Sequence, residues 1–241
     1  MRPGFKRVIA IILIFLGPGM IIWWIAHTFK NHFLEIPYLG YEYTYDESGK
    51  AIDSVPYKIP DIQLTSFDGS PITRDSIQDK FIILTTIQDN CPDFEECGLG
   101  VYVFNEIIFS TIVEHPSSYS NVRVLSLLTD QDGNPDSTIS QRLREEMASY
   151  DKNFWWFATG ENLPFYNFNY YGRKFNEHEA TSAEGEIGSN AFTSSLVLID
   201  RKGHIRGVTG AKKDADMRNF FDLLKLLKKE EFNENREKNK K

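Results

Sequence analysis

The sequence predicts an α/β sandwich, and three observations lead to that fold class. Apolar, β-branched runs typical of buried strands occur at 81–87 and 121–129. Each is followed by a segment with apolar residues at helical spacing, the order expected when strands and helices alternate. Near the C-terminus, two strand-like runs flank the turn Arg201-Lys202-Gly203 and precede a further helical pattern.

The other elements follow in order behind an N-terminal hairpin, whose turn is Asp68-Gly69. The predicted order of elements is β, α, β, α, β, β, α, which makes the sandwich one of thioredoxin type. The expected strands are the hairpin strands at 59–67 and 71–77, followed by strands at 81–87, 121–129, 154–158, 195–200 and 204–208. The expected helices are at 99–113, from a cap at Asp136 or Ser137 to Tyr150, and at 215–228 after a cap at Asp214. A short helix and a long loop are expected at 162–190.

Length and cysteine content restrict the class of protein. The chain has 241 residues, 41% of them hydrophobic, which is enough for one domain with a substantial core and some extra segments. Two cysteines are too few for a scaffold held together by disulfides. The pair is therefore expected to serve redox chemistry or metal binding.

The charge is unevenly distributed along the chain. The net charge is −7, and no acidic residue precedes Glu35. Four of the 27 basic residues lie before residue 31, which leaves 23 basic against 34 acidic residues and a net charge of −11 for the remainder. Such a surface repels nucleic acid and anionic lipid headgroups, so neither is an expected partner of the folded part.

The N-terminus predicts a membrane anchor. Residues 8–26 carry no formal charge and would form a helix of about 28 Å, close to the thickness of a bilayer core. Three basic residues precede the run, and Trp23 and Trp24 lie near its far end, so we expect a single-pass protein with a cytoplasmic N-terminus and a periplasmic domain. A cleaved signal peptide with an apolar region at 8–16 is the alternative.

The expected organisation follows from these segments. It comprises a cytoplasmic start (1–7), an anchor (8–27), a tether (28–57), the thioredoxin-like domain (58–229) and a charged, disordered tail (230–241).

Both cysteines lie in one stretch, KFIILTTIQDNCPDFEECGLG, at residues 80–100. A buried strand leads into a short polar loop that carries Cys91-Pro92, with a helical pattern beyond it. A helix N-terminus favours a thiolate, and a thiolate is both a nucleophile and a ligand for soft metals. Cys91 and Cys97 are therefore the candidate functional residues.

Four stretches resemble the SCO/SenC family of membrane-anchored, thioredoxin-like copper proteins of cytochrome c oxidase assembly. They are TTIQDNCPDFEEC, LSLLTDQDGNPDS, FWWFATG and LVLIDRKGHIRG, within residues 59–227. The resemblance implies copper as a cofactor, Cys91 and Cys97 as its ligands, and as partner a membrane-associated copper or thiol protein such as an oxidase subunit.

Two departures from the family pattern bear on copper binding. The family has three residues between its cysteines, whereas five separate Cys91 from Cys97, a distance of about 9 Å along a helix axis. Chelation would therefore need an irregular loop. The position of the family's histidine ligand is occupied by Phe192, and His178, most simply a solvated loop histidine, is a weak substitute.

Three functions remain open on the sequence. The first is a divergent SCO-like assembly factor that handles copper or the redox state of a partner's copper ligands. The second is a metal-free thiol-disulfide oxidoreductase with Cys91 as the attacking and Cys97 as the resolving thiol. The third is a binding module without chemistry, in which the cysteines are inert or form a structural disulfide.

Overall fold

The computed structural model describes residues 17–24, 36–88, 99, 101–130, 135–138, 140–161, 163–170, 173–175, 179–181, 187–190 and 195–238. The chain divides into two compact units, residues 1–35 and 36–241. In the first unit, residues 17–24 are helical. Cys91, Cys97, His178 and Phe192 lie outside the described residues.

Across these described ranges, no helix has both the length and the apolar character required to cross a bilayer. The expected anchor at 8–27 is described only at 17–24, and it stays a prediction.

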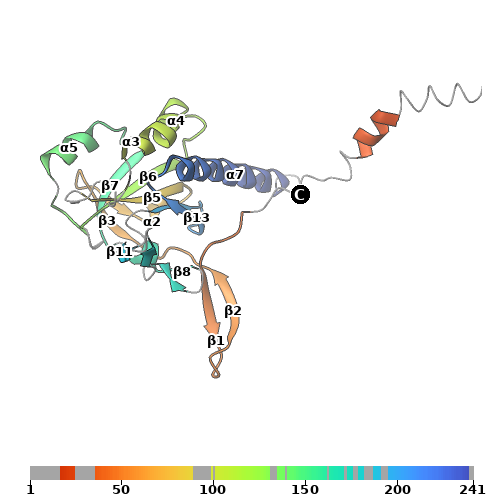
Figure 1. Cartoon of the computed structure of the whole chain (residues 1–241), viewed down its shortest axis with the longest axis horizontal. Helices are drawn as coiled ribbons and strands as arrows, with labels where there is room; N and C mark the ends of the chain where they lie inside the picture. Colours follow the sequence, from red (N-terminus) through yellow and green to blue (C-terminus); the bar gives the residue numbers. More distant parts are fainter. Residues whose placement is uncertain are drawn as a thin grey trace, which may run out of the picture. The chain divides into compact units, whose positions relative to one another are not determined.

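A seven-stranded mixed sheet forms the centre of the second unit (Figure 1). Its spatial order is β13-β12-β5-β6-β7-β3-β4, in which β5, β6 and β7 are parallel and the remaining neighbours antiparallel. The strands are β3 (Gln63–Ser66), β4 (Pro71–Thr73), β5 (Phe81–Gln88), β6 (Val122–Thr129), β7 (Trp155–Gly160), β12 (Ser195–Ile199) and β13 (Ile205–Gly210). This is the predicted thioredoxin-like α/β fold. The predicted N-terminal hairpin is the pair β3–β4, but its strands are shorter than the predicted 59–67 and 71–77, and residues 74–77, predicted as strand, are helical.

Alternation along the central strands divides the core into two layers. On β5, Ile83 packs into one apolar cluster, whereas Ile82 and Leu84 pack into the other. Val124 and Leu125 of β6 divide in the same way. Because side chains of a strand alternate between its faces, a run that is apolar at every position requires cover on both faces. The apolar runs therefore predicted the central strands correctly.

Helices cover the face of the sheet on which Ile83 and Val124 lie, the first face. Ile82 and Leu125 lie on the second face. They are α3 (Val101–Phe104), a π-helical turn η1 (Asn105–Phe109), α4 (Ser110–Glu114), α5 (Gln141–Ala148) and α7 (Asp214–Lys238). The predicted helix at 99–113 is thus interrupted by a π turn. The predicted cap of α5 was wrong, because Ser140 accepts the hydrogen bond from the Leu143 amide (3.2 Å). Asp136 instead closes a local turn onto the Thr138 amide (2.7 Å).

Two short helices and two small sheets accompany the second face. They are α2 (Arg74–Ile77), α6 (Leu163–Tyr166), β8 (Asn169–Tyr170) with β9 (Arg173–Lys174), and β10 (Glu179–Thr181) with β11 (Ile187–Asn190). The segment predicted as a short helix and a long loop thus contains four short strands. Phe168 and Phe175 stack with ring centroids 4.9 Å apart, which buries the aromatic content of this segment.

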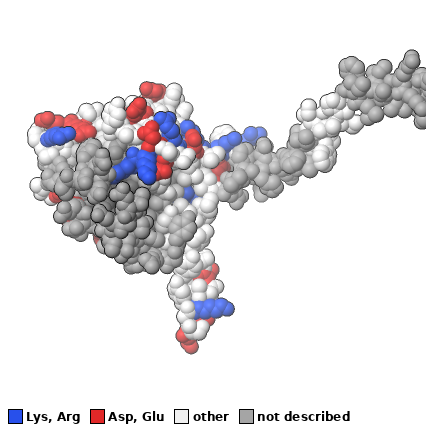
Figure 2. All heavy atoms as spheres, viewed as in Figure 1, with Lys and Arg blue, Asp and Glu red and all other residues white. Residues whose placement is uncertain are grey.

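The segment predicted as a tether is structured from Ile36 onward. It contains β1 (Tyr41–Tyr45) and β2 (Ala51–Pro56), which form an antiparallel hairpin that projects from the sheet (Figure 1). Figure 2 shows side chains of both charges on it. At its base Gly40 has φ 82°, and a Cβ there would lie 2.8 Å from the Phe168 ring. This close approach fixes the hairpin's base against the second core layer.

The region predicted as a disordered tail continues helix α7 to Lys238. Glu230 is the reason that this part is ordered. One of its carboxylate oxygens lies 2.5 Å from a guanidinium nitrogen of the buried Arg206, and the other accepts the Ile36 amide (2.9 Å). Arg206 also pairs with Asp200 (3.2 Å). Burial alone would lower the pKa of Arg206, but the hydrogen bonds and charges of these two carboxylates outweigh it and raise the pKa.

Replacing Arg206 with Leu is expected to reduce the free energy of unfolding by about 3–5 kcal/mol, because Asp200 and Glu230 would remain as buried, uncompensated charges. Urea unfolding followed by circular dichroism measures this change. The matched control is Arg218→Leu, which breaks an exposed pair with Asp214 and should cost no more than about 1 kcal/mol. Equal losses in the two variants would contradict the structural role of Arg206.

Candidate thiol site at the carboxyl end of β5

The cysteine segment leaves the sheet at the carboxyl end of β5. This strand and its parallel neighbour β6 end together, since Gln88 is paired with Thr129. The antiparallel strand β12 begins at Ser195, on the same edge, because Val197 is paired with Leu84. The described strand ends that flank 89–98, 131–134 and 191–194 therefore meet at one edge of the sheet. The first of these segments carries Cys91 and Cys97, and the last carries Phe192.

The base of the cysteine segment is closed. The amide of Leu99 donates a hydrogen bond to the carbonyl oxygen of Thr86 at 3.0 Å. Leu99 is buried and belongs to the same apolar cluster as Ile87. The chain thus leaves the sheet after Gln88 and is in contact with β5 again at Leu99. Backbone pairing and apolar burial together fix both ends of the segment that contains the thiols.

A second contact joins the ends of the two parallel strands. The side-chain amide of Gln88 donates to the carbonyl oxygen of Asp130 at 2.8 Å. Beyond β6, Thr129 forms an isolated bridge with Pro135, and the Asp136 amide donates to the Leu128 carbonyl (3.0 Å). The described residues on either side of 131–134 are therefore joined next to the carboxyl end of β5.

The helical region beyond the cysteines is firmly packed. Phe104 and Ile108 are fully buried, and the rings of Phe104 and Phe109 lie 5.1 and 4.7 Å from that of Trp155. The described helix begins at Val101, which is after both cysteines in the sequence. The prediction that a helix N-terminus activates Cys91 therefore has no described helix to support it, and it stays a prediction.

The ligands expected for copper stay predictions as well. Cys91, Cys97, His178 and Phe192 lie outside the described residues, and Asn190 is the last residue of β11. Among the residues that are described, no group of three or more His, Cys, Asp or Glu side chains could hold a metal ion.

The described histidines have local partners. His115 is the C-cap of α4. His204 is half-buried: its Nδ1 lies 3.0 Å from the Tyr57 carbonyl oxygen, and its ring centroid lies 5.2 Å from that of Tyr38.

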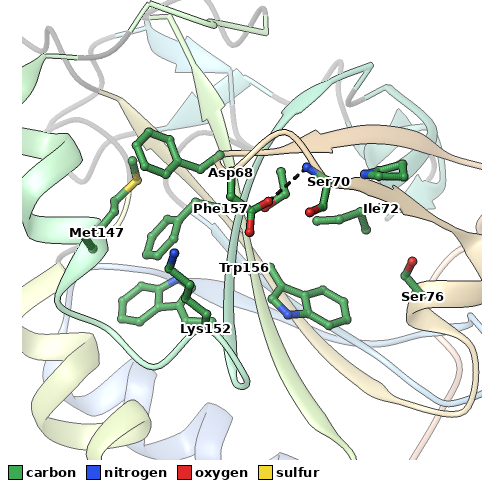
Figure 3. Close-up of a pocket in the computed structure, with 13 residues that line it drawn as sticks. Asp68, Ser70, Ile72, Ser76, Met147, Lys152, Trp156 and Phe157 are labelled. Atoms are coloured by element: carbon green, nitrogen blue, oxygen red, sulfur yellow. Dashed lines mark hydrogen bonds between the residues drawn. The ribbon is translucent and has the colours of Figure 1, made fainter.

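A pocket of about 240 Å³ lies at the opposite end of the parallel strands, beside the start of β7 (Figure 3). Trp156, Phe157 and Met147 provide apolar walls, and Lys152 lies among them. The Asp68 carboxylate at its edge accepts the Ser70 amide (3.0 Å). Of the two neighbouring tryptophans, Trp155 is buried and Trp156 is half-buried. This pocket is remote from the strand ends that carry the cysteine segment.

Replacing Gln88 with Met is expected to loosen the junction of β5 and β6, because the amide bond to Asp130 is lost while the side-chain volume is kept. The free energy of unfolding should fall by about 1 kcal/mol. The reduced cysteines should react faster with a thiol reagent such as dithionitrobenzoate, because the base of their segment opens more often. Gln63→Met, at an exposed position of β3, is the control. If the cysteines of Gln88→Met react at the wild-type rate, the hydrogen bond between Gln88 and Asp130 has no influence on the thiols.

No protein-family model matches the sequence, and no curated protein matches it. Solved structures similar to this chain include Sco/SenC proteins at low sequence identity. BsSco, described as a member of the Sco family of cytochrome c oxidase assembly proteins, has a TM-score of 0.46 at 14% identity over 73% of this chain and 96% of its own.

Two further structures are of the same kind. A SCO1/SenC family lipoprotein from Bacillus anthracis has a TM-score of 0.46 at 16% identity, covering 71% of this chain and 96% of its own. Bradyrhizobium japonicum ScoI with copper bound has a TM-score of 0.44 at 16% identity, covering 71% of this chain and the whole of its own.

Proposed function

We propose that this protein handles copper, or the redox state of a partner's copper ligands, through Cys91 and Cys97. The observation that carries the proposal is the closed base of the cysteine segment at the end of a central strand. Cys91 is three residues beyond Gln88, and Cys97 is two residues before Leu99. Three residues of extended chain reach about 11 Å, so the proposal places both thiols near this base. Such tethering raises the effective concentration of each thiol at the other.

This constraint bears on the spacing of the cysteines. Five intervening residues would hold the thiols apart on a continuous helix, whereas a segment that leaves and returns to one strand can bring its two limbs together. Thiolates are preferred ligands of Cu(I). Two neighbouring thiols are also the requirement for reversible disulfide formation. The proposal therefore assigns Cys91 and Cys97 as the two protein ligands of copper in the reduced state.

The proposed place of action is the outer side of a membrane. The uncharged run at 8–26 follows three basic residues, and an acidic domain follows it. In this arrangement the N-terminus is cytoplasmic and the domain periplasmic. The proposed partner is a membrane-associated protein with copper or thiol groups, such as a subunit of cytochrome c oxidase, which the resemblance to the SCO/SenC family implies.

A metal-free thiol-disulfide oxidoreductase is the second candidate. The observation that favours it is Phe192, because an apolar ring occupies the position at which the SCO/SenC pattern has a histidine ligand. Loss of that ligand weakens copper binding more than it weakens exchange between two thiols.

Anaerobic titration with Cu(I) against a competing chelator tests the first candidate. The reduced, full-length chain should bind one copper ion tightly. Cys91→Ser and Cys97→Ser should each weaken binding by at least about a hundredfold, since each removes one of two soft ligands. Arg206→Leu at a temperature where it remains folded controls for changes in stability. Absence of binding by the reduced wild-type chain would rule out copper handling.

The reduction potential of the cysteine pair tests the second candidate. Equilibration with glutathione or dithiothreitol buffers, followed by alkylation and mass spectrometry, measures it. A potential above about −300 mV is expected of an exchangeable couple, whereas a lower value would identify a structural disulfide. If copper does not bind and the potential is low, both chemical functions are excluded and a binding module remains.

A further inference from the structure

A second pocket, of about 290 Å³, lies at the amino end of β5, at the opposite edge of the sheet from the cysteine segment. It is bordered by the end of α2, the start of β5 and the turn between β12 and β13. Its floor is apolar and consists of the buried side chains Ile59, Ile77, Ile82 and Ile199. Its volume is at the small end of the range for ligand sites, about 300–1,000 Å³.

Four basic residues surround this apolar floor, namely Lys58, Arg74, Arg201 and Lys202. They come from three parts of the chain, and more than a hundred residues separate the first part from the last. The only acidic residues among those that line the pocket are Asp79 and Asp200. A basic rim is unusual for this domain, because the chain beyond residue 30 carries a net charge of −11. The local charge therefore needs an explanation other than general solubility.

Asp200 contributes little negative charge to the pocket. One of its carboxylate oxygens pairs with the buried guanidinium of Arg206 at 3.2 Å. The other accepts the amides of Lys202 and His204, each at 2.9 Å. The charge of Asp200 is thus balanced from within the fold, which leaves Asp79 as the acidic lining residue that faces the four basic ones. Two carboxylates from outside the lining, Asp61 and Glu231, also pair with Arg74 and Arg201.

Asp79 holds Arg201 at the edge of the pocket. Its backbone has φ 60°, a left-handed conformation that is uncommon for residues other than glycine. In this conformation its carbonyl oxygen accepts the Arg201 Nε–H at 3.1 Å, and its carboxylate lies 3.7 Å from the same guanidinium. Strained backbone of this kind is frequent at ligand sites. Glu231 lies 3.5 Å from a further nitrogen of Arg201 and restrains it from the other side.

Lys58 and Arg74 are the cations with the greatest freedom to meet a ligand. The stem of Lys58 passes over Gly203, where an added Cβ would lie 3.6 Å from the Lys58 Cγ. This contact directs the stem along the turn while the residue stays exposed. Arg74 pairs with Asp61 at 2.9 Å, but both side chains are exposed, and an exposed pair of this kind is easily exchanged for another anion.

We propose that this pocket binds an organic carboxylate that carries a branched apolar group. The isoleucine floor would receive the apolar part, and the guanidinium groups of Arg74 and Arg201 would receive the carboxylate, since a planar guanidinium matches the geometry of a carboxylate. Lys58 adds a third positive charge at the entrance. Two sources share this chemistry, namely a free branched carboxylic acid and the C-terminal carboxylate of a peptide that ends in an apolar residue.

Titration of the full-length chain with 4-methylpentanoate, followed by calorimetry and amide NMR shifts, tests the proposal. The expected result is saturable binding that shifts the amides of Ile59 and Gly203. The neutral amide of the same acid should bind at least about tenfold more weakly, because the charge-assisted hydrogen bonds are lost. N-acetyl-alanyl-leucine and its C-terminal amide form a second pair of probes. Tighter binding of the peptide acid would identify a peptide terminus as the source, and tighter binding of 4-methylpentanoate a free acid.

The variant for this test is Lys58→Gln combined with Arg74→Gln. Both side chains are exposed, so the fold should be retained, and affinity for the acid should fall by at least about tenfold. The control is Lys50→Gln, which removes one positive charge at the β1–β2 hairpin, away from the pocket. Equal affinity for acid and amide, equal affinity in the double variant, or no saturable binding of either acid would each overturn the proposal. These results are independent of copper binding, because the cysteine segment lies at the other edge of the sheet.

Discussion

The buried guanidinium of Arg206 connects the parts of the fold that are most distant in sequence. It contacts the Ile36 carbonyl where the chain enters the domain, Asp200 at the β12–β13 turn, and Glu230 near the end of α7. The ring of Tyr38 lies 4.4 Å from the guanidinium carbon. Loss of either carboxylate partner would leave this buried cation under-compensated, at a cost of several kcal/mol. Arg206 therefore fixes the entry segment at Ile36, the β12–β13 hairpin and helix α7 to one another.

The central sheet connects Arg206 and its partners to the carboxyl end of β5, where the cysteine segment follows. The β12–β13 hairpin is bound to α7 and the entry segment through Arg206, and β12 pairs directly with β5. Since β5 is buried on both faces, its carboxyl end is a rigid support for the segment that follows. A thiol site needs this support at its base more than it needs a regular helix between the thiols. The proposed function of Cys91 and Cys97, whose spacing departs from the family pattern, rests on that support.

Local sequence was sufficient for the elements that are governed by burial or by turns. The apolar, β-branched runs of β5 and β6 and the Asp68-Gly69 turn predicted the central strands and the N-terminal hairpin, because these patterns have few alternatives. The end of α7 was missed for the opposite reason. Glu230 lies in an alternating charged sequence typical of a solvated helix end, and its partner Arg206 is 24 residues away. The β1–β2 hairpin was missed because its tyrosines, largely exposed, give no burial signal.

The two candidate sites differ in how visible they are in the sequence, and the difference has a physical cause. Thiol chemistry depends on rare residues, so two cysteines after a buried strand can be recognised without a structure. A carboxylate site depends on common residues gathered by folding. Lys58, Arg74 and Arg201 have no pattern in sequence, and the strongly negative domain charge argues against any anion ligand until the topology places them around one apolar floor. β5 begins beside the proposed acid-binding pocket and ends where the proposed thiol segment follows, so the two proposed sites lie at opposite ends of one buried strand and have no contact with each other through the described residues.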